Sequence, residues 1–319
     1  FDVNTFRLIG RELITDRITA VFELVKNSYD ANATNVYVEF KNVSKAKQKG
    51  IITIRDDGEG MSLTDIREKW MVVGTASKRT HDTSSPPFNR RYVGEKGIGR
   101  FAVDKLGGKV YIKTKKRGEQ KLLTVEINWD NYENLAKQKK LTLFTDIENR
   151  FYETDDDVNN QGTILEIHNI HDTWSSHDLE RLYKELGKIV SPFYPLNPPF
   201  NVIIFSNEIK KFDNRLVFTD TVKYSSNSGE IGFDLENKKQ EILEFNEKIG
   251  KIVKKQVPIK SFGPLKMKLF YFDETAKRNY NAAYRKDRID GVKIYRDGLI
   301  TTPFAEFESN PNKQRDIIG

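Results

Sequence analysis

The sequence predicts an α+β fold in which helices cover one face of a sheet, followed by a second, smaller domain. The chain has 319 residues, a length that favours two domains. Residues 14–30 repeat apolar side chains with the period of a helix. Residues 35–40 and 51–56 alternate with the period of a strand. This helix-strand-turn-strand beginning is typical of a sheet with helices on one side.

Composition limits the classes of function. The chain has no cysteine, which excludes disulfides and agrees with a cytoplasmic protein. No apolar run approaches the roughly 20 residues that span a bilayer, so we expect no membrane partner. The net charge of +7 permits a nucleic-acid partner, although abundant acids among the cations favour an ordinary solvated surface. The four histidines lack the spacing of a metal site.

The first helix is predicted from about Asp16 to Asp30. Apolar side chains three or four residues apart form one stripe that anchors it in a core: Ile14, Ile18, Val21 and Val25. Glu23, Asn27 and Asp30 lie together on the opposite side, because each residue turns the helix by roughly 100°. The alternative is a merely solvated helix face.

Two glycine-bearing segments favour a functional role for that face. Residues 56–61 (DDGEGM) follow a predicted strand, and their glycines allow a sharp turn close to a flat ligand. Asp57, at the strand's end, is placed to accept a hydrogen bond from an exocyclic amine. Residues 94–99 (GEKGIG) open an apolar run, a pattern that predicts a glycine-rich turn before a helix. Such a turn binds anions, and Lys96 adds a cation suited to phosphate.

The order of these segments, with a Gly162-Thr163 strand entry after them, resembles the GHKL ATPases. That superfamily includes the ATPase component of DNA gyrase, the heat-shock chaperone of the ninety-kilodalton class, sensor histidine kinases, MutL and MORC. The resemblance covers about half of the chain, from residue 1 to roughly residue 170. It implies a Bergerat-type α/β sandwich ATPase domain over residues 1–172, with an ATP lid at about 74–98. Because several spaced motifs coincide, the resemblance is specific.

The resemblance implies a role for each motif residue. Glu23 is expected to be the general base for the attacking water, and Asn27 the Mg²⁺ ligand. Asp57 is expected to bind the adenine amine with support from Thr163, for which an ordinary strand residue is the alternative. Asp30 is expected to brace the helix. The remaining expected ATP-binding residues are Gly60, Met61, Thr75, Ser77, Lys78, Gly94, Lys96, Gly97, Ile98, Gly99, Arg100 and Phe101. For residues 74–79 a surface turn is the alternative interpretation.

Residues 173–319 are expected to form a transducer-like (S5-like) β-α domain, truncated at its C-terminal end. A helix at 178–189 begins it, and strands are predicted at 202–205, 215–224 and 265–272, with a hairpin at 292–302. In dimeric relatives a transducer lysine contacts the phosphates. Lys313 is the candidate here and Arg296 a weaker one; a solvated charge is the alternative for both.

Before the second domain, the sequence predicts strands at 109–114, 121–127 and 141–148, a basic insertion at 131–140 and an acidic turn at 154–161. Residues 236–255 are charged, and their pattern leaves helix and strand both open.

The function implied by the resemblance is a Mg²⁺-dependent ATPase whose nucleotide state gates homodimerisation of a larger, MORC-like or defence-related protein. The alternative is an ATP-switched clamp, or a machine that engages nucleic acid or an effector protein, with very slow hydrolysis. Histidine kinase activity is disfavoured, because a water-activating Glu23 is unnecessary when a histidine accepts the phosphoryl group.

Overall fold

A computed structural model describes most of the chain. The described residues are 14–45, 49–70, 88, 90, 99–129, 131, 149–190, 199–218, 225–233, 240–246, 251–257, 265–284, 292–296 and 299–305. Two compact units make up the chain: Phe1–Thr219 with Tyr295–Thr301, and Asp220–Ile294 with Thr302–Gly319.

Within the described part of the first unit, eight strands form one sheet in the order β5-β4-β3-β6-β2-β1-β7-β8. Their bounds are β1 (Asn35–Lys41), β2 (Ile51–Asp56), β3 (Gly107–Lys115), β4 (Lys121–Asn128), β5 (Arg150–Asp155), β6 (Gly162–Ile170), β7 (Asn201–Ser206) and β8 (Arg215–Val217). Adjacent strands are antiparallel, except that β1 and β7 run parallel. The sheet is therefore mixed.

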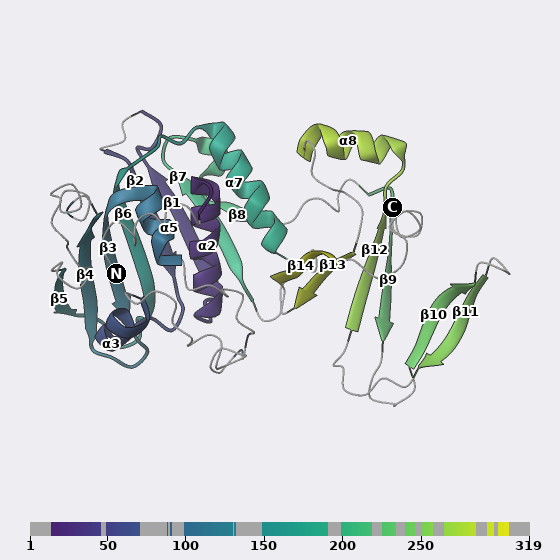
Figure 1. Cartoon of the computed structure of the whole chain (residues 1–319), viewed down its shortest axis with the longest axis horizontal. Helices are drawn as coiled ribbons and strands as arrows, with labels where there is room; N and C mark the ends of the chain where they lie inside the picture. Colours follow the sequence, from purple (N-terminus) through teal and green to yellow (C-terminus); the bar gives the residue numbers. More distant parts are fainter. Residues whose placement is uncertain are drawn as a thin grey trace, which may run out of the picture. The chain divides into compact units, whose positions relative to one another are not determined.

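The helices of this unit lie on one face of the sheet (Figure 1). Their bounds are α2 (Arg17–Asp30), α3 (Leu63–Asp65), the π-helical turn η2 (Ile66–Trp70), α5 (Gly99–Leu106), α7 (Ser176–Ile189) and the 3-10 turn η4 (Lys210–Phe212). Helix α2 packs against both α5 and α7. The α/β layering predicted from the sequence is confirmed.

Local sequence explains where these helices begin. The Asp16 carboxylate caps α2 by accepting a hydrogen bond from Thr19 N (2.8 Å). Ser62 with Asp65, and Ser175 with Asp178, form capping boxes at α3 and α7. The predicted helix from about Asp16 to Asp30 agrees with the boundaries of α2.

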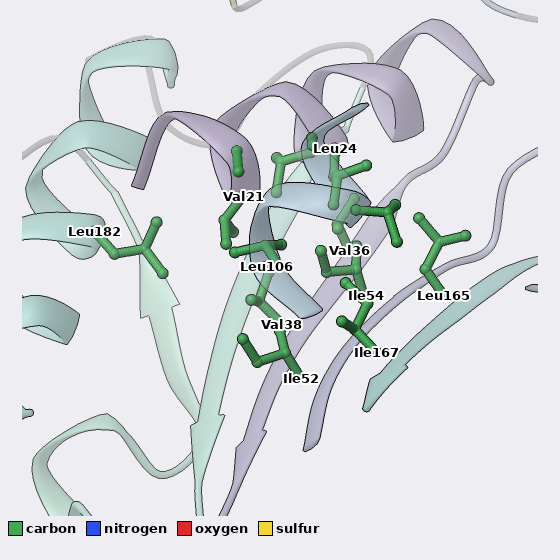
Figure 2. Packing of buried hydrophobic residues seen from close by; sticks show 14 of the residues in the cluster. Val21, Leu24, Val36, Val38, Ile52, Ile54, Leu106, Leu165, Ile167 and Leu182 are labelled. Carbon is green, nitrogen blue, oxygen red and sulfur yellow. The ribbon is translucent and has the colours of Figure 1, made fainter. Parts of the chain in front are cut away.

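The core lies between the sheet and the helices. Val21 and Leu24 of α2 face alternate residues of the central strands, and Leu106 of α5 fills the space beside them (Figure 2). The apolar stripe predicted for the first helix is buried, with Ile14, Ile18, Val21 and Val25 all at most 3% exposed. Burying these side chains stabilises the layer by about 1.5–3 kcal/mol each.

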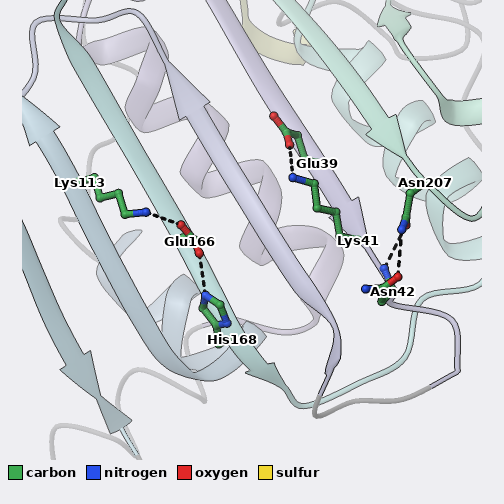
Figure 3. A network of polar contacts seen from close by, with 7 residues as sticks. All are labelled: Glu39, Lys41, Asn42, Lys113, Glu166, His168 and Asn207. Carbon is green, nitrogen blue, oxygen red and sulfur yellow. Dashed lines mark hydrogen bonds and ion pairs between the residues drawn. The ribbon is translucent and has the colours of Figure 1, made fainter. Parts of the chain in front are cut away.

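The other face of the sheet carries polar side chains (Figure 3). Glu166 of β6 accepts a hydrogen bond from Lys113 Nζ (2.7 Å) and contacts His168 Nε2 (2.9 Å). Such one-sided burial is common in largely antiparallel sheets, and it explains the alternation seen in the sequence.

The predicted domain boundary at residue 172 falls inside the first unit. Helix α7 packs on α2, and β7 pairs with β1 from Asn35↔Asn201 to Phe40↔Ser206. Because β7 completes the sheet, the first unit continues to Thr219.

Several other elements differ from prediction. Thr154 and Asp155 belong to β5 rather than to the acidic turn. The strand predicted at 215–224 is described only at β8, and the prediction at 141–148 lies outside the described residues.

Beyond Thr219 the described elements are strands and one helix: β9 (Asn227–Phe233), β10 (Gln240–Asn246), β11 (Lys251–Val257), β12 (Leu265–Tyr271), α8 (Glu274–Tyr284), β13 (Val292–Arg296) and β14 (Leu299–Ala305). β9 pairs with β12, β10 with β11, and β13 with β14. The undecided segment 236–255 therefore contains strands. Helix α8 was not predicted; its signal is Asp273, whose carboxylate accepts from Ala276 N (2.7 Å). No helix in the described part of the chain combines the length and apolar character needed to cross a membrane.

Candidate functional site

The site centres on Asp56, the last residue of β2. Its Oδ2 accepts a hydrogen bond from Ser28 Oγ of α2 (2.8 Å). Its Oδ1 accepts from the backbone N–H groups of Gly58 (3.0 Å) and Thr163 (3.3 Å). One carboxylate therefore joins α2, the turn after β2 and the start of β6.

The surroundings of Asp56 alter its acidity. Burial raises the pKa of Asp56 to about 6, and the nearby Asp57 charge also raises it, whereas the three hydrogen bonds lower it. The residue nevertheless keeps part of its surface exposed. Three protein donors fix the orientation of this buried carboxylate, which still has lone pairs able to accept a hydrogen bond from a ligand.

Asp57, the predicted adenine ligand, makes four hydrogen bonds to the start of β1. It accepts from Thr34 N (2.6 Å), Thr34 Oγ1 (2.6 Å), Asn35 N (2.9 Å) and Asn35 Nδ2 (2.8 Å). Burial raises the pKa of Asp57, but these hydrogen bonds outweigh burial and hold it below its usual value. Asp57 is thereby committed to connecting β2 with β1.

A sequence signal for Asp56 existed in the strand alternation. Ile52 and Ile54 are buried on the helix side of the sheet. Because side chains alternate along a strand, Asp56 lies on that side as well, whereas Asp57 follows after the strand has ended. In the sequence, Asp56, Gly58 and Gly60 form an acid-x-Gly-x-Gly pattern, in which Asp56 is the acid.

Glycines bring the chain close together around Asp56. Gly60 has φ +68°, and a Cβ there would lie 1.9 Å from Lys115 O. Gly162 has φ +121°, and its Cβ would lie 2.1 Å from Asp56 O. Both positions combine a left-handed backbone with close approach, so only glycine fits them.

Two threonines organise the wall next to this turn. Thr114 Oγ1 of β3, which is fully buried, accepts from Met61 N (2.8 Å). It also contacts Thr163 Oγ1 (3.0 Å) and lies 3.2 Å from Gly162 O. Thr163, predicted as a supporting residue, thus contacts Asp56 through its backbone and Thr114 through its hydroxyl. Thr114 was not predicted from the sequence.

Helix α2 presents the other predicted residues. Glu23 and Asn27 are partly exposed, one turn apart, while Asp30 is buried at 7% exposure. Glu23 Oε1 forms an ion pair with Lys26 Nζ at 2.7 Å. Glu23 also lines a cavity of about 330 Å³ between α2 and α7, whose lining includes neither Asp56 nor Asp57.

Part of the prediction lies outside the described residues: Thr75, Ser77, Lys78, Gly94, Lys96, Gly97, Ile98 and Lys313. Gly99, Arg100 and Phe101 form the first turn of α5, so the helix predicted after the glycine-rich segment is present. Among the described residues, no group of three or more acids and histidines is arranged to hold a metal.

Comparison with known proteins gives a family match over this region. The model for the "Histidine kinase-, DNA gyrase B-, and HSP90-like ATPase" family matches residues 15–160. That range includes α2, β2 and the turn after Asp56.

Curated relatives match shorter segments. A putative type II restriction enzyme, HgiDII from Herpetosiphon aurantiacus, is 29% identical over 103 residues, 32% of this chain and 15% of the relative. MutL from Parabacteroides distasonis is 26% identical over 132 residues, which are 41% of this chain and 20% of that relative. PMS1 protein homolog 1 from Homo sapiens is 35% identical over 79 residues, 24% and 8%. The matched segments span a fifth or less of these relatives.

Proposed function

Residues 15–160 belong to the histidine kinase-, DNA gyrase B- and HSP90-like ATPase family, and from this premise we propose that the chain binds and hydrolyses ATP with Mg²⁺. The observation that carries the proposal is the carboxylate of Asp56. It is held by Ser28, Gly58 and Thr163, and the residue as a whole is partly exposed. An ionised carboxylate in this orientation accepts a hydrogen bond from the adenine amine. It repels the carbonyl oxygen that guanine has at the same position. We therefore assign adenine recognition to Asp56 in place of Asp57.

The residues next to Asp56 suit the binding of a flat adenine ring. Gly60 lets the chain pass close to β3, and Met61 is held there through its backbone N–H by Thr114. Met61 supplies an adaptable apolar contact for a flat ring. Thr163 adds a hydroxyl beside Asp56, so adenine meets an acceptor and a hydroxyl on the same edge.

The chemical step is assigned to α2. Glu23 is the general base, which orients the attacking water and takes its proton. Asn27, partly exposed one turn later, offers an amide oxygen of the kind that Mg²⁺ prefers. Bound Mg²⁺ neutralises charge on the phosphate oxygens. The Lys26 ion pair restricts the orientation of the Glu23 carboxylate.

Two further groups complete the proposed site. Lys96 and the backbone N–H groups of residues 94–99, with residues 75–78, are assigned to the phosphates. Lys313 stays a candidate for an additional cation from a transducer-like domain.

Steady-state ATP turnover tests the assignment of Glu23 as the general base. Glu23→Ala removes the proton acceptor but not the adenine or phosphate contacts, so ATP affinity should change less than a few-fold while kcat falls by about 10²-fold or more. Binding is measured by calorimetry and turnover by phosphate release. A Glu23→Ala protein that retains kcat within a few-fold would disprove the assignment of Glu23.

A second candidate function is a nucleic-acid-engaging machine in which ATP acts mainly as a switch. It is favoured by the net charge of +7, and two relatives carry DNA-related names, a restriction enzyme and a mismatch-repair protein. Steady-state turnover with and without single- or double-stranded DNA or RNA tests it. Stimulation of several-fold would support this candidate, and a flat response at low salt would count against it.

A further inference from the structure

Lys115, the last residue of β3, is a buried lysine whose side chain is only 2% exposed. Its Nζ donates a hydrogen bond to the backbone carbonyl oxygen of Asp157 and lies 3.4 Å from Asp156 Oδ2. Both partners belong to residues 156–161, which connect β5 to β6 and which we call the β5–β6 loop. A buried cation is costly unless it is paired and hydrogen-bonded, and these contacts offset that cost. The lysine cation therefore joins the end of β3 to this loop.

The two partners of Lys115 also organise the β5–β6 loop internally. Asp157 Oδ1 accepts hydrogen bonds from Asn159 N (2.9 Å) and Asn159 Nδ2 (3.0 Å). Asp157 O accepts from Asn160 N (2.9 Å), and Asp156 Oδ1 accepts from Asn160 Nδ2 (3.1 Å). Lys115 thus bonds to the residues that hold the rest of the loop together.

The β5–β6 loop ends at the proposed adenine site. Gln161 Nε2 donates to Asp57 O (3.1 Å), in the turn after β2. At the next residue, Gly162, a Cβ would lie 2.1 Å from Asp56 O. Thr163 N then donates to Asp56 Oδ1 (3.3 Å). The position of the loop is therefore coupled to a backbone donor that orients the Asp56 carboxylate.

The backbone of Lys115 contacts the turn after β2 as well. A Cβ at Gly60 would lie 1.9 Å from Lys115 O, and Lys115 is opposite Gly162 in the pairing of β3 with β6. Lys115 thus touches this turn through its backbone and the β5–β6 loop through its side chain. The Asp56 carboxylate accepts one hydrogen bond from each of these segments, from Gly58 N and from Thr163 N.

We propose that Lys115 is a positioning residue, which holds the β5–β6 loop against the turn after β2 and so sets the affinity and the selectivity of the site for adenine. This inference rests on the proposed function, which assigns adenine recognition to Asp56. A carboxylate in a fixed orientation accepts a hydrogen bond from an amine and repels a carbonyl oxygen. If the segment that orients the carboxylate shifts, the carboxylate can turn away, and both effects become weaker.

Replacement of Lys115 by methionine tests the proposal, because methionine has a similar length but no charge and no donor. Removing buried charges in favour of apolar groups is often neutral for stability, and Asp156 keeps 27% exposure, so its charge stays solvated. The variant should therefore fold with little change in thermal stability.

The nucleotide measurements compare ATP with inosine triphosphate, whose base has a carbonyl oxygen in place of the adenine amine. In Lys115→Met, ATP affinity should fall about five- to tenfold, and the ratio of ATP affinity to inosine triphosphate affinity should fall about threefold. Calorimetry measures both. The kcat at saturating ATP should stay within about twofold, because the proposed base Glu23 lies on α2, so the loss appears in KM.

Lys113→Met is a matched control in the same strand. Lys113 Nζ forms an ion pair with Glu166 Oε2 at 2.7 Å, which joins β3 to β6 rather than to the β5–β6 loop. This variant loses a lysine and its ion pair, as Lys115→Met does. It should keep the ATP affinity and the nucleotide selectivity of the wild-type protein.

Gln161→Met tests whether Lys115 acts through the loop. It removes the hydrogen bond to Asp57 O without removing a charge, and it should reproduce the loss of affinity and selectivity. In the double variant with Lys115→Met the two losses should not add, because both changes release the same loop. Losses that multiply would overturn the proposed route.

Amide hydrogen exchange gives a readout that needs no nucleotide. In nucleotide-free Lys115→Met, the amides of Asn159 and Asn160 should exchange faster than in wild-type protein and in Lys113→Met, because both amides bond within the loop. Unchanged exchange would overturn the role of Lys115 in holding the loop.

The outcomes separate this inference from the proposed function. If wild-type protein binds no ATP, or binds inosine triphosphate equally well, the proposed adenine site itself fails. If wild-type protein prefers ATP and Lys115→Met keeps that affinity and selectivity, only the role of Lys115 is overturned. It is also overturned if Lys115→Met weakens both nucleotides equally, since a merely structural role predicts that result. If Lys115→Met does not fold, unchanged selectivity in Gln161→Met overturns the proposal.

Discussion

Asp56 and Asp57 are neighbours in the chain, yet their carboxylates have different partners. Asp56 bonds to α2, the turn and β6, and it keeps some exposure. The Asp57 carboxylate accepts four hydrogen bonds from Thr34 and Asn35. One acid therefore links α2 to the turn and β6, while the other links β2 to the start of β1.

Amide substitution should separate these roles. In Asp56→Asn the amide can keep the contacts to Gly58 and Ser28, so the protein should lose little stability. Its NH₂ group, however, is a hydrogen-bond donor that faces another donor, the adenine amine, so ATP affinity should fall at least about tenfold. In Asp57→Asn the amide opposes donors of Thr34 and Asn35, so unfolding free energy should fall by about 1–3 kcal/mol. Calorimetry and denaturant unfolding measure both, with each variant as the other's control. The reverse result would return adenine recognition to Asp57.

The pKa of Asp56 predicts a pH effect on stability. Its folded value of about 6 is raised above the ordinary value of 3.8, so the protonated form is favoured in the folded protein. This contribution to the free energy of unfolding is fully present below about pH 4 and is lost as pH rises through about 6. Relative to Asp56→Asn, wild type should therefore lose up to about 3 kcal/mol between about pH 4 and about pH 7. Denaturant unfolding across that range measures the difference, which would stay constant if Asp56 titrated normally.

Elements with strong local signals agree with their prediction. The N-terminal cap at Asp16, the stripe of α2 and the alternation of β1 and β2 all follow from short stretches of sequence. Helix α8, by contrast, is rich in polar residues (ETAKRNYNAAY) and was missed. The backbone groups of β10 pair with those of β11. The side-chain pattern of the charged segment 236–255 does not indicate this pairing, so the sequence left helix and strand both open there.

The turn after β2 depends on close approach between elements. Gly60→Ala would place a Cβ 1.9 Å from Lys115 O of β3, so the turn or β3 must shift. Gly118→Ala is the matched control, because Gly118 also has positive φ (+81°) but its added Cβ meets nothing within 4 Å. Gly118→Ala should cost about 1 kcal/mol, and Gly60→Ala at least about 2 kcal/mol more. Equal thermal and denaturant stability of the two variants would contradict the close approach.

At the scale of the whole molecule, the sheet joins segments from most of the first unit. β1 pairs with β2 on one side and with β7, about half the chain away, on the other. That pairing extends the unit past the boundary expected at 172. The second unit consists of short sheets and α8 in its described part, and its assignment as a transducer-like domain stays a proposal.

Nucleotide-gated self-association belongs to this scale. We expect the chain to shift from monomer towards dimer when Mg²⁺ and a non-hydrolysable ATP analogue are added, and Glu23→Ala to show the same shift with ATP itself. Light scattering measures the mean mass. Asp56→Asn, whose ATP affinity should be at least about tenfold lower, is the control and should shift towards dimer only at correspondingly higher nucleotide concentrations. A wild-type mass that does not change with nucleotide would argue against gating of dimerisation by ATP.

The local elements, the one-sided burial of the sheet and the resemblance of residues 15–160 to a family of ATPases can all be read from the amino-acid sequence. These follow from periodicity, caps and motif spacing, which act over a few residues. Only the tertiary structure shows which hydrogen-bond partners each of the two adjacent acids has, where the first unit ends, and that Arg90 bonds to both Tyr29 O of α2 and Pro199 O before β7. Those outcomes depend on strand register and on contacts between residues tens to more than a hundred positions apart, and only the folded chain brings such residues together.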